Sequence, residues 1–173
     1  MRKIAKQDIV SARGEHAPVI PDLGEGKRGE GGYFGYLLRQ AGAAHRLRME
    51  RVLADLGITP PQFVVLTMLV AYPGISGADL ARLAVLTPQT VSVIVANLER
   101  SGAIVRRSHP VHGRIQQIDV TEGGRALLKR CRARVKKLEA RMAAGFTPEE
   151  ELVIRRWLVN VAREDDCAGW SAP

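Results

Sequence analysis

Two short helical segments follow one another with only a few residues between them, and this spacing restricts the fold more than any other feature. Ser76 stands three residues before Asp79 at the start of the first segment, and Thr87 stands before Pro88 at the start of the second. Both pairs are typical of a capped helix start. Apolar residues recur at helical spacing in the two segments: Leu80, Leu83, Ala84, Val91, Ile94, Val95 and Leu98. We therefore expect two short helices joined by a tight turn, each with one buried face.

The period of the sequence changes after Gly102, a residue type that favours a helix C-terminus. Residues 103–107 and 114–120 are rich in β-forming side chains, and the segment between them contains Pro110 and Gly113. This combination predicts a β-hairpin with an extended tip.

Two longer helical patterns precede this region. Residues 33–56 repeat apolar side chains at helical spacing and stop at Gly57. Thr59 is then placed to cap a buried helix, which the pair Pro73-Gly74 ends. Helix, short helix, tight turn, second helix and hairpin in this order form a winged helix-turn-helix, so we expect a mainly α (α+β) fold.

A final long helix is predicted after the hairpin, with Thr121 as its cap and a further helix opening at Thr147. Its apolar residues form a stripe that steps by four, four, three and four positions: Leu127, Cys131, Val135, Leu138 and Met142. A stripe with roughly heptad spacing needs an apolar partner, and too few other elements exist in one chain to cover it. We expect it to pack on a second copy of the chain, and packing within one chain is the alternative.

These patterns divide the chain into five parts. Residues 1–32 are rich in glycine and form an irregular N-terminal arm, and residues 33–58 form a first dimerisation helix. Residues 59–121 form the winged helix-turn-helix, residues 122–165 the C-terminal dimerisation helices, and residues 166–173 a tail.

The charge balance favours a polyanionic partner. Lysine and arginine number 26 against 18 acids, which gives a formal charge of +8 and places nucleic acid first among such partners. The longest apolar run, Phe63–Tyr72, is shorter than the ~18 residues that a membrane span needs, and the N-terminus lacks the apolar core of a secretory signal. We expect a cytoplasmic protein without membrane contact.

No residue pattern in the chain points to catalysis, a metal or a cofactor. Cys131 and Cys167 lie far apart, without the Cys or His spacing of a zinc site. No Ser/His/Asp order, paired-carboxylate motif or phosphate-binding loop occurs either. We therefore expect no enzyme, no metal and no cofactor. A small enzyme that uses His45 or His112 is a weak alternative, because neither histidine has an evident orienting partner.

The motifs of this region resemble those of the multiple-antibiotic-resistance regulator (MarR) family. The resemblance covers about residues 33–163 and is most specific between 58 and 124; the motifs are LGITPPQFVVL, PGISGADLARL, TPQTVSVIVANLERSGAIVRR, HGR and DVTEGG. It implies a homodimer in which the first and last helices pack between subunits. It also implies that the two winged domains bind an inverted repeat in double-stranded DNA.

In such a protein the second short helix enters the major groove. Six residues would face the bases there: Pro88, Gln89, Thr90, Ser92, Val93 and Asn97. Gln can pair bidentately with adenine. Many relatives carry an arginine where Val93 stands, and because valine cannot pair with guanine we expect a half-site rich in A and T.

Phosphate contacts would come from Arg106 and Arg107 on the hairpin and from Arg114 at the wing. The family usually carries an acid at the wing tip that braces an arginine, but His112-Gly113 stands here instead. The wing is then looser, or His112 itself faces phosphate.

The most basic stretch of the chain lies elsewhere. Eight cations between residues 125 and 141 are answered by Glu139 alone. We interpret this stretch as a solvated helix face opposite the apolar stripe, with a DNA surface as the alternative.

The resemblance further implies a repressor that a small aromatic or apolar acid releases from DNA. Members of the family often form an effector cleft near the positions of His45, Arg46 and Met49, although a structural role is the alternative for His45. The alternative function is a winged-helix protein-interaction module without sequence-specific DNA binding, because Val93 weakens the base-reading face. The retained hairpin arginines argue against that alternative.

Overall fold

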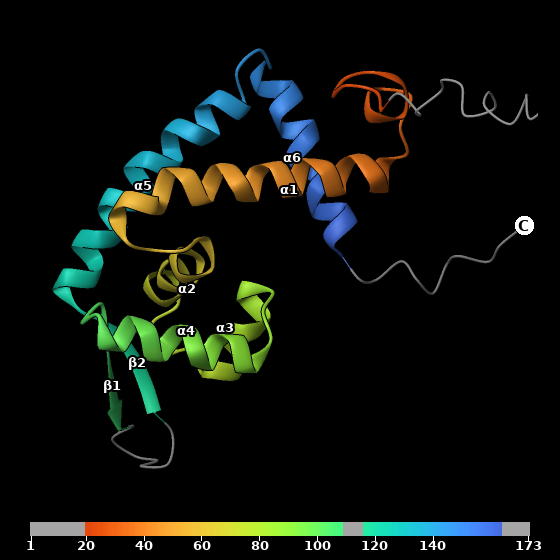
Figure 1. Cartoon of the computed structure of the whole chain (residues 1–173). Coiled ribbons are helices and arrows are strands. Elements are labelled where there is room, and N and C mark those ends of the chain that lie inside the picture. The colour runs from red at the N-terminus through yellow and green to blue at the C-terminus, as the bar shows by residue number, and fades with distance from the viewer. Residues whose placement is uncertain (1–19, 109–115, 164–173) are drawn as a thin grey trace, which may run out of the picture. The chain divides into compact units, whose positions relative to one another are not determined.

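The computed structural model describes residues 20–108 and 116–163, which form a mainly helical fold with one small sheet (Figure 1). In chain order the elements are η1 (Gly26–Arg28), α1 (Phe34–Leu53), η2 (Ala54–Leu56), α2 (Pro60–Ala71), α3 (Gly77–Ala84), α4 (Pro88–Arg100), β1 (Ile104–Ser108), β2 (Gln116–Val120), α5 (Glu122–Met142) and α6 (Pro148–Ala162). The predicted fold class, mainly α with a winged helix-turn-helix, is confirmed. The chain divides into two compact units, residues 1–44 and 45–173, so α1 contributes to both.

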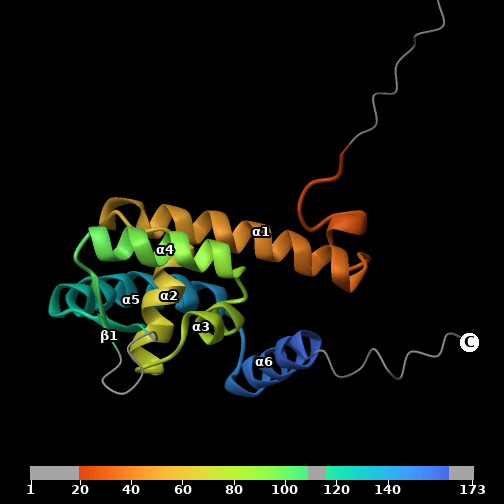
Figure 2. The same cartoon turned by 90° about the horizontal axis from the view of Figure 1, so that it is seen from below.

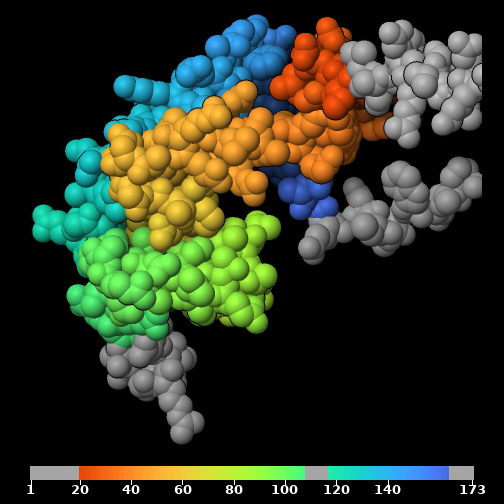
Figure 3. Space-filling view, viewed as in Figure 1, coloured from red at the N-terminus to blue at the C-terminus, as the bar shows by residue number. Residues whose placement is uncertain are grey.

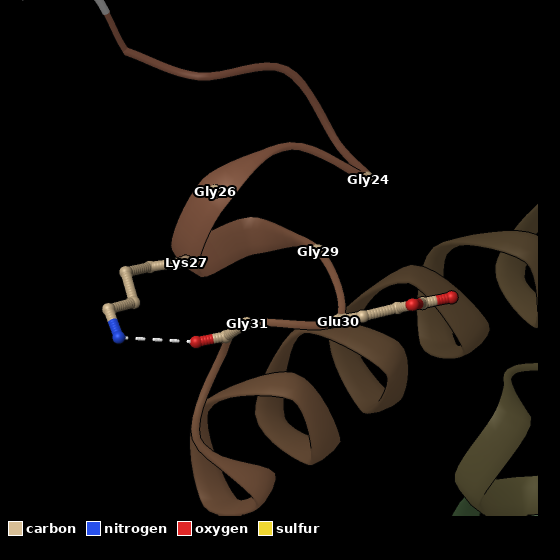
Figure 4. A pocket seen from close by; sticks show the side chains of 6 residues that line it. All are labelled: Gly24, Gly26, Lys27, Gly29, Glu30 and Gly31. Carbon is tan, nitrogen blue, oxygen red and sulfur yellow. Dashed lines mark hydrogen bonds between the residues drawn. The ribbon is translucent and has the colours of Figure 1, made fainter.

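The described part of the first unit begins with turns around the 3-10 helix η1. Lys27 Nζ donates a hydrogen bond to the carbonyl oxygen of Gly31 at 3.2 Å (Figure 4). The same Nζ lies 5.2 Å from the ring centroid of Tyr33. The glycines around it line a hollow of about 660 Å³. A side chain at Gly29 would collide with the carbonyl of Gly24, so glycine is required for this close approach of two backbone segments.

In the second unit, α2, α3 and α4 pack on one another around a shared apolar core (Figures 1 and 2). The side chains at its centre are fully or nearly fully buried: Val65, Leu66, Leu80, Val91, Val95 and Leu98. The predicted helix starts are confirmed, because a side-chain oxygen accepts a backbone N–H of the first turn at Thr59, Ser76, Thr87, Thr121 and Thr147. Each such cap is worth about 1 kcal/mol, so the sequence fixes where the helices begin.

The turn between α3 and α4 contains a residue in an unusual backbone conformation. Val85 has a φ of 53°, in the left-handed region, and its side chain is 90% exposed. Its N–H donates to the carbonyl of Arg82 at 3.2 Å, and the N–H of Leu86 donates to the carbonyl of Ala81 at 3.0 Å. This is the Schellman arrangement, in which glycine usually takes the left-handed position because a β-branched residue there is strained.

The predicted hairpin is confirmed as an antiparallel pair of strands. Its register pairs Ile104 with Val120 and Arg106 with Ile118. The first strand begins one residue later than the pattern predicted, because the N–H of Ala103 still donates to the carbonyl of Leu98 in α4, at 2.9 Å. The hairpin tip lies outside the described residues.

The base of the hairpin is joined to the start of α5 through Thr121. Its Oγ1 accepts the N–H of Gly124 at 3.0 Å and donates toward the carbonyl of Gly102 at 2.7 Å. Gly124 is buried and its Cα faces the backbone of Ala103 so closely that any Cβ would lie against the carbonyl oxygen and 2.9 Å from Val120 Cγ1. Thr121 therefore both closes the base of the hairpin and caps the start of α5.

The stripe on α5 corrects one premise of the sequence argument. Cys131 and Leu138 are 0% and 7% exposed within a single chain, whereas Met142 is 43% exposed. Leu127 and Val135 are partly buried against the same core. The expectation that one chain cannot cover this stripe is wrong at its centre, because α2 and η2 pack against α5. Burial also raises the pKa of the Cys131 thiol, which therefore behaves as a small apolar side chain.

An ion pair joins α5 to η2, the 3-10 helix that directly follows α1. Arg134 pairs with Asp55 and also donates to the carbonyl of Val52 at 3.4 Å. The hydrogen bond from Arg134 lowers the pKa of Asp55. Arg134 is half-buried. Among the described residues, it is the one cation of the basic stretch, residues 125–141, that forms an ion pair.

We predict that Gly124→Ala destabilises the protein by about 1–3 kcal/mol, because the added methyl group must displace the backbone of Ala103. Urea denaturation measures this change. Gly123→Ala is the matched control: its Cβ would meet no atom closer than Thr121 Oγ1 at 3.7 Å. The control should instead gain up to about 1 kcal/mol of helix propensity. Equal effects of the two substitutions would contradict the close packing at Gly124.

Candidate nucleic-acid interface

The N-terminal half of α4 presents a continuous exposed surface. Pro88, Gln89, Thr90, Ser92 and Val93 are all exposed, and the side chain of Val93 retains 61% of its accessible area. The opposite face of α4 lies in the core, so the helix is held rigidly from behind. In the space-filling view α3 and α4 form one open green surface (Figure 3). The structure thus brings together the first five of the six residues that we predicted to face bases, and it leaves Asn97 half-buried further along.

Hydrogen bonds within α4 distinguish these side chains from one another. Thr90 Oγ1 lies 2.8 Å from Thr87 Oγ1, and Ser92 Oγ donates to the carbonyl of Pro88 at 2.9 Å. Asn97 Oδ1 accepts a hydrogen bond from Arg100 at 2.9 Å. Gln89 has no hydrogen bond to the described residues, so its amide is the polar group most available to a ligand.

The two hairpin arginines are paired with acids that the sequence argument did not connect to them. Arg106 Nε lies 3.1 Å from Glu99 Oε2, which joins β1 to the end of α4. Arg107 Nε lies 3.4 Å from Asp119 Oδ2 across the hairpin. Surface pairs of this kind are weak, so a phosphate can replace the carboxylate, while the acids keep the guanidinium groups oriented. His112 and Arg114 lie outside the described residues.

A cavity of about 370 Å³ lies between the start of α3, the N-terminal half of α4 and the hairpin. Val91, Val95 and Ile118 form its apolar wall, and Arg106 is the one charged residue among the described residues that line it. Neither residue spacing nor composition indicated this cavity, because its wall residues also belong to the ordinary core pattern.

The three residues predicted for an effector cleft on the first helix differ in environment. Met49 is 6% exposed and packs in the core of the single chain. Arg46 is exposed and lies 3.9 Å from Glu50. His45 is half-buried, and its Nδ1 is buried without a hydrogen-bond partner among the described residues.

An acid in the first turn of α3 supports the helix that precedes α4. Ser76 Oγ donates to Asp79 Oδ2 at 2.6 Å, and Arg82 pairs with the same carboxylate. These two contacts, first the Ser76 hydrogen bond and then Arg82, lower the pKa of Asp79.

Within residues 20–108 and 116–163, no group of three or more His, Cys, Asp or Glu side chains is placed to hold a metal ion. No single helix of the described ranges is both long enough and apolar enough to cross a membrane.

A helix-turn-helix with an exposed second helix and a basic hairpin beside it defines the winged helix-turn-helix class of proteins. The profile of the MarR family matches residues 56–115. The chain is also 40% identical over 131 residues to the HTH-type transcriptional repressor Rv2887 of Mycobacterium tuberculosis, an alignment that covers 76% of this chain and 94% of that protein. The chain belongs to the MarR family of winged-helix transcriptional regulators.

Solved structures agree with this assignment. Rv2887 has been solved in complex with DNA, and this chain resembles it with a TM-score of 0.61 and 37% identity over 76% of this chain and 98% of that one. With Rv2887 in complex with p-aminosalicylic acid the TM-score is 0.62 and the sequence identity 37%, and the alignment covers 76% of this chain and 99% of that one. With the repressor CouR, bound to a 23-mer DNA duplex, the TM-score is 0.71 and the sequence identity 26%, and the alignment covers 76% of this chain and 93% of that one.

The lowered pKa of Asp79 predicts a specific dependence of stability on pH. The unfolded chain binds more protons than the folded one in the acid range, because the folded pKa is below the ordinary 3.8. The contribution of Asp79 is therefore complete above the unfolded pKa and is lost as the pH falls through the folded pKa. Asp79→Asn should lose less thermal stability than the parent when the pH falls from about 5 to about 2.

Ser76→Ala is the companion variant in this experiment. It removes the largest cause of the shift, so it should also flatten the acid limb of the curve, although Arg82 remains. Parallel curves of melting temperature against pH for the parent and Asp79→Asn would show that the carboxylate has no such role.

Proposed function

We propose that the protein is a sequence-specific DNA-binding repressor that acts in the cytoplasm. The observation that carries this proposal is the exposed N-terminal half of α4 with Arg106 and Arg107 on the adjoining hairpin. A helix with one face buried in the core and the other exposed can enter the major groove, and guanidinium groups beside it can bind the phosphate backbone. The DNA complexes of Rv2887 and CouR support the same use of this fold.

Within this surface we assign base contacts to Gln89 and Val93, with Pro88, Thr90, Ser92 and Asn97 as neighbours. The Gln89 amide is free to pair with adenine, and the methyl groups of Val93 can contact the methyl group of thymine. A half-site rich in A and T follows. Arg114 and His112 stay candidates for the wing contact to phosphate.

We further propose that the operator is an inverted repeat read by a homodimer. The helix α6 contains no buried residue in the single chain, although it carries several large apolar side chains that are 44–63% exposed: Leu152, Val153, Leu158, Val159 and Val161. Met142 at the end of α5 is exposed as well. Apolar area of this extent favours burial against a second copy of the chain.

The effector, in this proposal, is a small aromatic acid that binds in the cavity beside α4. A volume of about 370 Å³ is in the range of small-molecule sites, which begins at about 300 Å³. A ring can lie against Val91, Val95 and Ile118 while the carboxylate takes the place of Glu99 on Arg106. Binding would then compete with DNA for Arg106, and the p-aminosalicylic acid complex of Rv2887 supports this ligand class. The second candidate effector site is on the first helix, at His45, Arg46 and Met49.

Two substitutions test the DNA-binding surface once an operator has been selected from genomic fragments with the purified protein. Gln89→Ala should cost about 1–3 kcal/mol on the operator and little on random DNA, because a base contact is lost and phosphate contacts remain. Arg107→Gln should weaken both complexes alike and lower the salt slope by about 1. Fluorescence anisotropy at several salt concentrations measures both effects. Failure to enrich any common sequence would favour the protein-interaction module instead.

The dimer is tested on α6 with one new charge at two adjacent positions. Val161→Glu should dissociate the dimer, because an unpaired charge would enter an apolar interface. Asn160→Glu adds the same side chain at a position that is already polar, and it should leave the dimer intact. Light scattering over a range of protein concentrations distinguishes the two. A dimeric Val161→Glu variant with full operator affinity would remove α6 from the interface.

The effector site is tested with p-aminosalicylic acid and the two neighbouring hairpin arginines. Arg106→Gln should raise its Kd about tenfold or more, because a charge-assisted hydrogen bond is lost. Arg107→Gln removes the same charge one residue away, outside the lining of the cavity, and should change the Kd less than about twofold. Isothermal titration calorimetry gives both values. Loss of binding in His45→Gln alone would assign the effector to the first helix.

A further inference from the structure

A second groove is lined by the C-terminal part of α2 and the first half of α5, and no described residue of α4 lines it. The two helices pack against each other, and Figure 2 shows their ribbons. Its volume is about 230 Å³. Leu128, which is 2% exposed, and the half-buried Val70 form its apolar floor. Arg125, Lys129 and Arg132 form the rest of its lining, and all three are exposed.

The three cations occupy one face of α5, because they are four and three residues apart. At a rise of about 1.5 Å per residue, the first and the last lie about 10 Å apart along the helix. Like charges at this spacing repel one another, which costs stability unless an anion is near. Among the described residues none of the three has an ion-pair partner, in contrast to Arg106, Arg107 and Arg134.

The combination of floor and rim selects a ligand class. Three neighbouring cations favour an anion with more than one charge, and a phosphate monoester meets this need better than a carboxylate because it carries about −1.5 to −2 charge on three acceptor oxygens. The apolar floor favours a ring or a short chain attached to that anion. A cavity of about 150 Å³ is enough for a benzene ring, so a groove of 230 Å³ has room for a small aromatic group.

We propose that this groove is a binding site for an aromatic or aliphatic phosphate, with the phosphate on Arg125, Lys129 and Arg132 and the apolar group on Val70 and Leu128. The DNA backbone is the less favoured occupant, because a phosphodiester chain has no use for an apolar floor. The site is separate from the cavity beside α4, and the proposal does not depend on the assigned operator or effector.

The test uses the full chain and 1-naphthyl phosphate, with inorganic phosphate and 1-naphthol as the two halves of the probe. Calorimetry should give one site per chain and a Kd at least about tenfold lower for 1-naphthyl phosphate than for either half. The double variant Lys129→Gln/Arg132→Gln should raise that Kd about tenfold or more. Both positions are exposed, so the fold is retained, and circular dichroism verifies this.

The matched control is Lys137→Gln/Arg141→Gln, which removes two exposed cations of the same helix that do not line the groove. It should change the Kd less than about threefold. Equal weakening in both double variants would reduce the effect to net charge and overturn the proposal. Three other results would also overturn it. The protein could bind inorganic phosphate as tightly as 1-naphthyl phosphate, or Arg106→Gln could abolish binding of the probe. The Lys129→Gln/Arg132→Gln variant could also keep its affinity for the probe and lose affinity only for DNA with long flanking sequences.

Discussion

The arrangement of α4, the hairpin and α5 in the second unit depends on the two hydrogen bonds of the Thr121 hydroxyl group. This hydroxyl accepts the N–H of Gly124 and donates toward the carbonyl of Gly102, so it joins the end of α4, the base of the hairpin and the start of α5 at one atom. Gly124 is buried beside it because only a residue without a side chain lets α5 approach the backbone of Ala103. The direction of the hairpin, and with it the position of Arg106 and Arg107, follows from this junction.

The chain treats its positive charges in two ways. Arg106, Arg107 and Arg134 each have a carboxylate from another element, and these pairs hold the guanidinium groups at defined places on the hairpin and on α5. Arg125, Lys129 and Arg132 have no such partner among the described residues and surround an apolar floor instead. The formal charge of +8 describes neither arrangement, because the number of cations says nothing about which of them are neutralised.

Local signals in the sequence predicted the helix starts, the turn between α3 and α4, and the hairpin. Caps and turn residues act within four positions along the chain, so they can be recognised without the fold. The stripe on α5 could not be assigned in this way. Its spacing indicates that Cys131 and Leu138 are buried, but the identity of the covering surface depends on α2 and η2, which are distant in sequence. The pairs of Arg106 with Glu99 and Arg107 with Asp119 depend on the register of the hairpin and on where α4 ends, and residue types alone do not define these.

Val85 has a mechanical consequence for the second unit. A valine in the left-handed region is strained, and two hydrogen bonds back to α3, from the N–H groups of Val85 and Leu86, hold it in this conformation. Strain of this kind persists only where surrounding contacts hold it, so the packing of α3 against α4 maintains the conformation of the turn. Separation of the two helices would release the strain, because Val85 could then return to the extended or right-handed region. A ligand that loosens the contact between α3 and α4 therefore needs less binding free energy to displace α4 than the area buried between the two helices alone would require.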